Sequence, residues 1–63
     1  MCEFKVYLDG VKVAEDVVYA KQEAGRVVVR DVVGAAQSLE GAVIVEVDVF
    51  STRLVLTRNQ GGG

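Results

Sequence analysis

The chain has 63 residues and no His. It contains seven Lys and Arg and nine Asp and Glu, which gives a formal net charge of −2. This length leaves room for one domain with a thin core. The negative charge gives no long-range attraction for phosphate backbones. Without His the chain lacks the usual general base, so we expect no enzyme. The chain has neither a secretory signal nor the ~18 unbroken apolar residues of a membrane span, so we expect a cytoplasmic protein without a membrane partner.

The first segment predicts a half-buried strand. Residues 2–9 alternate strictly between apolar and polar side chains, which is the period of a strand with one buried face. The apolar face consists of Cys2, Phe4, Val6 and Leu8. Asp9–Gly10 follows and is a typical hairpin turn. Valine supplies 15 of the 63 residues and proline none, which favours extended backbone further along the chain.

The second segment is longer and less regular. Residues 11–23 predict a returning strand, with a bend or bulge at Glu15–Asp16. A turn at 23–25 leads into a third strand over 26–33. An amphipathic helix over 14–24 is the weaker alternative, because the segment is rich in β-branched residues and shows no clear i, i+3, i+4 stripe.

The last third of the chain predicts three more strands. Residues 34–36 break the chain before a short strand that ends at Gly41. Residues 42–50 alternate again, and a turn at Ser51–Thr52 leads into 53–58. We expect the interior to contain mostly Phe4, Val6, Leu8, Val27, Val29, Val45, Val47, Leu54 and Leu56.

Five or six short strands joined by tight turns predict an all-β fold. We expect a small, strongly bent barrel of antiparallel strands as a single domain over residues 1–58. Residues 59–63, which include three glycines, have nothing to bury, so we expect a disordered tail.

Cys2 is the only cysteine, and it has two interpretations. A free cysteine often packs as a small hydrophobe, so Cys2 can simply belong to the apolar face of the first strand. Alternatively, its thiolate binds a metal ion together with nitrogen donors of the chain terminus. If Met1 is removed, the Cys2 amine and thiolate close a five-membered chelate. If Met1 stays, its amine, the Cys2 amide nitrogen and the sulfur form a tridentate set.

Both donor sets combine nitrogen and sulfur in a nearly planar arrangement. Planar sets suit Ni(II) or Cu(II), whereas Zn(II) prefers a tetrahedron of side chains that one chain cannot supply. One chain also offers too few donors for a closed site. A two-fold homodimer would bring two Cys2 residues together, and such dimers are the commonest oligomers.

Three segments resemble the CooT family of small nickel-binding proteins. These are MCEFKVYLDG at the start, GRVVVRDVVG in the centre and EGAVIVEVDVFSTRLVL near the end, so the resemblance covers residues 1–57. It implies an SH3-like or Sm-like barrel that dimerises. It also implies one Ni(II) per dimer at the interface, bound by Cys2 and the adjoining backbone of Met1. The role implied is a nickel chaperone for carbon monoxide dehydrogenase.

RNA binding is the first alternative, since related archaeal sequences are described as RNA-binding and small barrels often bind single strands. The residues that could assemble a basic surface are Lys5, Tyr7, Arg26, Arg30, Arg53 and Arg58. Because acidic residues are interspersed among them, mixed surface charge is the simpler interpretation and nucleic-acid binding is not favoured.

Two further functions are weaker alternatives. The Gly-rich end is similar to that of ubiquitin-like carriers, but those folds place a helix across the sheet and this sequence predicts none. Glu15, Asp16, Glu46 and Asp48 suggest a hydrolase or a hard-metal site. Outward carboxylates are normal on an antiparallel sheet, and no nucleophile accompanies them, so we reject catalysis.

Overall fold

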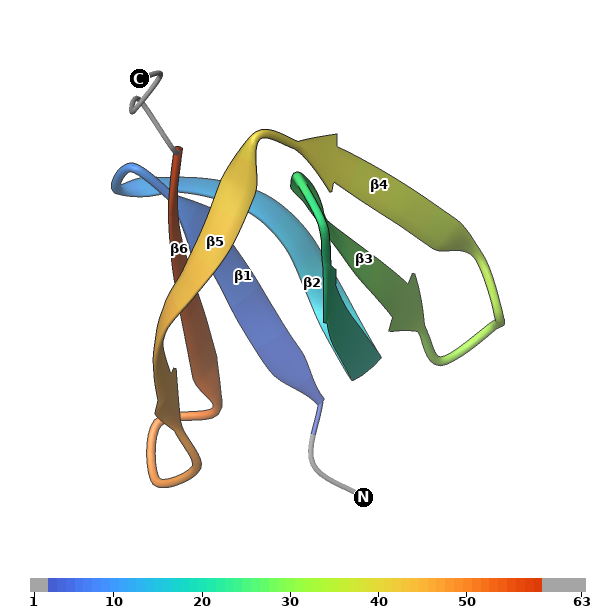
Figure 1. Cartoon of the computed structure of the whole chain (residues 1–63). Helices are drawn as coiled ribbons and strands as arrows, with labels where there is room; N and C mark the ends of the chain where they lie inside the picture. The colour runs from blue at the N-terminus through green and yellow to red at the C-terminus, as the bar shows by residue number, and fades with distance from the viewer. Residues whose placement is uncertain (1–2, 59–63) are drawn as a thin grey trace.

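A computed structural model of the chain describes residues 3–58, which form six strands and no helix (Figure 1). The strands are β1 (Phe4–Leu8), β2 (Val11–Glu23), β3 (Arg26–Asp31), β4 (Ala36–Glu40), β5 (Ala42–Asp48) and β6 (Arg53–Arg58). The predicted all-β fold is confirmed, and the alternative helix over 14–24 is wrong. Within the described residues there is no helix that could cross a membrane. The expectations for Met1, Cys2 and the tail at 59–63 concern residues outside this range.

The six strands form one sheet in the order β4-β3-β2-β1-β6-β5, curled into a small barrel. Four of the five pairs are antiparallel, but β1 and β6 run parallel, so the prediction of antiparallel strands throughout needs correction. The physical reason is that β6 enters the sheet from its hairpin with β5. Its direction is therefore set by β5 and not by its other neighbour, β1.

Two backbone features shape the long strand β2. The turn before it has positive φ at both Asp9 (51°) and Gly10 (84°), as a type I′ hairpin turn requires. Within β2, Asp16 also has a positive φ of 58°, and the register with β1 slips by one residue between the Val6–Ala14 and Phe4–Val17 pairs. This is the predicted bulge. It bends β2 so that its first part pairs with β1 and its last part with β3.

The side chain of Gln22 connects β2 to the edge strand β5. The backbone N–H of Ile44 donates to Gln22 Oε1 at 2.9 Å, and Gln22 Nε2 donates to the carbonyl oxygen of Ala42 at 3.3 Å. Nearby, the Gly41 N–H donates to the Gly25 carbonyl at 2.7 Å. An amide side chain thus satisfies backbone groups of β5 that would otherwise form an open edge, and the barrel is closed at this end.

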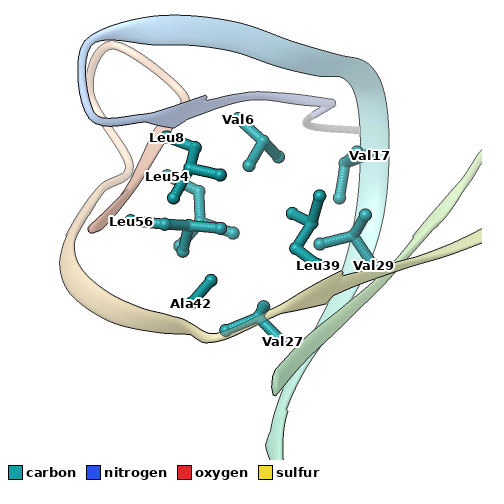
Figure 2. Close-up of a cluster of buried hydrophobic side chains, with 9 residues drawn as sticks. All are labelled: Val6, Leu8, Val17, Val27, Val29, Leu39, Ala42, Leu54 and Leu56. Atoms are coloured by element: carbon teal, nitrogen blue, oxygen red, sulfur yellow. The ribbon is translucent and has the colours of Figure 1, made fainter. Parts of the chain in front are cut away.

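All six strands contribute to the hydrophobic core (Figure 2). The buried residues are Val6, Leu8, Val17, Val27, Val29, Leu39, Ala42, Leu54 and Leu56. Six of the nine residues predicted to lie inside are among them, and Phe4 is half-buried against the same cluster. The prediction is wrong for Val45 and Val47, which are mostly exposed.

A bulge in β5 explains the error at Val45, and an open end of the barrel explains the error at Val47. Ile44 pairs with Leu56 and Glu46 with Val55, so Val45 is an extra residue in the strand. Ala42 and Ile44 face the core before the bulge, so strict alternation from them would turn Val47 outward, and the insertion returns Val47 to the interior side. Val47 consequently pairs with the buried Leu54 and faces the interior side of the sheet, but at an open end of the barrel where it remains accessible.

Candidate functional site

Both residues predicted to bind a metal, Met1 and Cys2, lie outside the described residues 3–58. Glu3, the first of the described residues, is exposed, and β1 begins one residue later at Phe4. The surface beside Phe4 is therefore the described surface nearest in sequence to the candidate ligands.

Phe4 lines an apolar groove between β2 and β5. The groove has a volume of about 250 Å³ and forms where β2, after its bulge, leaves β1 and continues only along β3. Its lining comes from four strands and contains no charged residue: Phe4, Val17, Val18, Tyr19, Ala20, Ile44, Val47 and Leu54. The core of the barrel is thus open to solvent on this side, and Leu54 lies at the boundary between core and groove.

The turn between β5 and β6 lies at the same end of the barrel as the start of β1 (Figure 1). The Lys5 N–H donates to the Thr52 carbonyl at 2.9 Å, which attaches the turn to β1. Within the turn, the Ser51 N–H donates to the Asp48 carboxylate at 3.2 Å. This hydrogen bond is the main reason that the pKa of Asp48 lies below its ordinary value of 3.8, with a smaller contribution from the Arg53 charge. The turn is therefore held by its own backbone and one carboxylate.

The described residues offer no competing metal centre. Among residues 3–58, no group of three or more Cys, His, Asp or Glu side chains is close enough together to hold a metal ion. The two carboxylates that suggested a hard-metal or hydrolytic site on β5 have other roles, since Asp48 stabilises the turn and Glu46 faces outward on the strand.

The positions predicted for an RNA-binding surface are largely engaged with partners of the same chain. Arg26 forms an ion pair with Glu40 at 3.3 Å, and Arg53 lies 4.0 Å from Asp48. Arg58 donates through Nη1 to the Glu40 carbonyl at 3.1 Å. Acidic partners beside these cations reduce the positive potential that a phosphate backbone requires. The structure gives this alternative no specific support.

Sequence reasoning missed the groove entirely. The pattern of 42–50 placed Val47 in a closed interior, because alternation within one strand gives no sign of where the curved sheet stays open. The pair formed by Tyr19 and Arg30, whose guanidinium lies 5.5 Å from the ring centroid, was also missed, since it depends on the register between β2 and β3. One signal was available: an aromatic residue, Phe50, stands directly before the polar turn residues 51–52.

The fold and the groove define a class: small β-barrel proteins with an apolar groove beside the start of β1. The particular family follows from comparison with known proteins. The chain matches the family model of the CO dehydrogenase accessory protein CooT over residues 1–57, and it belongs to that family. The match includes Met1 and Cys2, and the family is that of an accessory protein and not of the enzyme itself. No curated protein matches the chain.

Proposed function

We propose that the protein binds nickel and delivers it, as a metallochaperone, to a nickel enzyme of the carbon monoxide dehydrogenase type. One observation carries the proposal: the family match to a CO dehydrogenase accessory protein spans the only cysteine of the chain. The absence of a metal-ligating cluster among residues 3–58 supports the same assignment, because it leaves the terminus as the source of soft donors.

The proposed ligands are the Cys2 thiolate and nitrogen atoms of the adjoining backbone, with Met1 supplying its amine where it is retained. Nitrogen and thiolate donors in a planar arrangement suit Ni(II), which prefers square-planar or tetragonal coordination. Ni(II) is the cargo here, and a ligand set that precedes β1 in the sequence can be offered to a client protein without opening the barrel.

A homodimer completes the proposed site. Cys2 of one chain supplies at most part of a four-coordinate set, and a two-fold axis near the chain termini brings an equal set from the second chain. The stoichiometry is then one Ni(II) per dimer. The start of β1 and the β5–β6 turn lie together at one end of the barrel, so a dimer formed through this end would bring the starts of the two β1 strands near each other.

Nickel binding is expected to weaken as the pH falls below neutral. The thiol must lose its proton to act as a ligand, so binding releases protons and is favoured at higher pH. Titrations in two buffers of different ionisation enthalpy measure the number of protons released. A pH-independent affinity between pH 6 and pH 8 would argue against a thiolate ligand.

The decisive test is isothermal titration of Ni(II) into tag-free protein and into Cys2→Ser. We expect tight binding at one Ni(II) per two chains for the natural protein, together with sulfur-to-nickel charge-transfer absorption in the near ultraviolet. Cys2→Ser should lose both while its far-ultraviolet circular dichroism is unchanged. Extending the N-terminus by a tag is the matched perturbation of the amine: it retains the thiolate but displaces the terminal nitrogen, so we expect weaker binding. Equal affinities for the natural protein and Cys2→Ser would end the proposal.

A further inference from the structure

Phe50 is the most exposed large apolar residue among those described. It lies in the β5–β6 turn, and its relative accessibility is 104%, so the whole ring is in water. Val47 and Val49 on the same segment are 57% and 63% exposed. Single exposed apolar residues are normal, but three exposed apolar residues within four positions, one of them aromatic, are typical of a protein contact.

The groove next to this turn is an apolar space that a ring of this size can enter. An apolar cavity of about 150 Å³ is large enough to hold benzene, and the groove measures about 250 Å³. Its lining residues carry no charge that a ring would have to desolvate. Phe50 of the same chain points out of the turn into solvent and does not line the groove.

The exposed Phe50 side chain (the knob) and the apolar groove (the hole) lie at the same end of the molecule. Val47 lines the groove and stands only three residues before Phe50, and Leu54 lines it four residues after Phe50. In a dimer with two-fold symmetry every contact occurs twice, so a surface that carries both a knob and a matching hole is complementary to itself. A surface with only one of these features would instead indicate an unlike partner.

We propose that the occupant of the groove is Phe50 of a second copy of this chain, and that the two copies exchange Phe50 reciprocally about a two-fold axis. This inference rests on the homodimer of the proposed function and assigns its interface. Position supports it, because Phe4 in the groove is two residues from Cys2 in the sequence, so the exchange brings together the ends of the two barrels at which β1 begins.

The area available is adequate for a stable dimer. The chain has an accessible surface of 4041 Å², and an interface of standard size takes about 800 Å² from each partner, or about a fifth of this surface. Each buried Phe contributes about 150–250 Å², so the two Phe50 rings supply a substantial part of the total. The exposed apolar side chains around the groove that can supply more are Val18, Tyr19, Val47 and Val49.

Sedimentation of the tag-free protein without metal and with Ni(II) tests this interface. We expect a dimer in both conditions at 100 μM, because the contact is apolar and does not require nickel. Phe50→Ser removes the knob and Val47→Glu places a charge in the hole, so each should raise the dimer dissociation constant at least tenfold. Val33→Ser is the matched control, since Val33 is 84% exposed in the β3–β4 turn, away from the groove. It should leave the dissociation constant unchanged.

The outcomes separate this inference from nickel binding. Cys2→Ser should lose nickel and remain dimeric, which would support the interface independently of the metal. A dimer that forms only with Ni(II), or a Phe50→Ser variant that dimerises as tightly as the natural protein, would overturn the inference and leave the nickel proposal standing. A natural protein that is monomeric in both conditions would also overturn it. Unchanged circular dichroism of Phe50→Ser, expected for a residue with no contacts to lose, verifies that the variant is folded.

Discussion

The two ends of the barrel are built differently. At one end the chain is closed by side-chain and backbone hydrogen bonds from Gln22 and Gly41, above fully buried residues such as Val27 and Ala42. At the other end β2 and β5 diverge, and an apolar groove opens beside the start of β1. The closed end uses its apolar surface for folding. The open end leaves apolar side chains in water, where they add little to the stability of the single chain and are available for the proposed dimer contact.

Replacing one valine by alanine at each end of the barrel should give the largest difference in the free energy of unfolding. Val27 is completely buried and Val47 is 57% exposed, so Val27→Ala should lower the free energy of unfolding by about 2 kcal/mol and Val47→Ala by less than ~0.5 kcal/mol. Urea denaturation of dilute protein measures both values. At higher protein concentration the cost of Val47→Ala should grow, because dimerisation couples to folding. Equal costs in dilute protein would show that the groove is closed in solution.

Removing the Gln22 side-chain amide, which closes the barrel, should lower the free energy of unfolding by an intermediate amount. Gln22→Leu keeps the size of the side chain but leaves the Ile44 N–H and the Ala42 carbonyl without this partner, so we expect a loss of about 1–2 kcal/mol in urea denaturation. Hydrogen exchange at the Ile44 amide should accelerate more than exchange in β3. The matched control is Gln37→Leu on the exposed part of β4, which should change stability by less than ~0.5 kcal/mol. Similar losses in both variants would mean that Gln22 does not close the barrel.

The smallest change in stability is expected for Asp48, whose carboxylate holds the β5–β6 turn at the open end of the barrel. The pKa of Asp48 is lower in the folded chain than its ordinary value of 3.8, chiefly through the Ser51 hydrogen bond. A lowered folded-state pKa stabilises the protein above the ordinary carboxyl pKa, and this contribution disappears as the pH falls through the lowered value. Asp48→Asn should therefore be slightly less stable than the natural protein at pH 7, and the difference should disappear as the pH falls through the lowered pKa of Asp48. Glu46→Gln on the same strand is the control, and a difference that persists in acid would contradict the assignment.

Local patterns in the sequence predicted much of the fold. The alternation of residues 2–9 and 53–58 placed Val6, Leu8, Leu54 and Leu56 inside correctly, because the period of two is a property of each strand by itself. The turn at Asp9–Gly10 and the bulge near Asp16 were also predicted from residue type. The family was recognisable from three short segments, which include the chain's only cysteine.

Other features were decided only when distant parts of the chain met. The parallel pairing of β1 with β6 joins segments about fifty residues apart, and no local pattern encodes it. The bulge at Val45 depends on how β5 fits against β6, and it leaves Val45 as an extra residue outside the core. Val47 faces the interior side of the sheet, and its exposure depends on the opening of the barrel at that end. The sequence by itself thus determined where strands and turns form and which residue carries the thiol. The tertiary structure decided which apolar residues remain exposed, because exposure depends on how the curved sheet closes. At the end that does not close, Phe4 and Val47 line an apolar groove and Phe50 lies in solvent beside it.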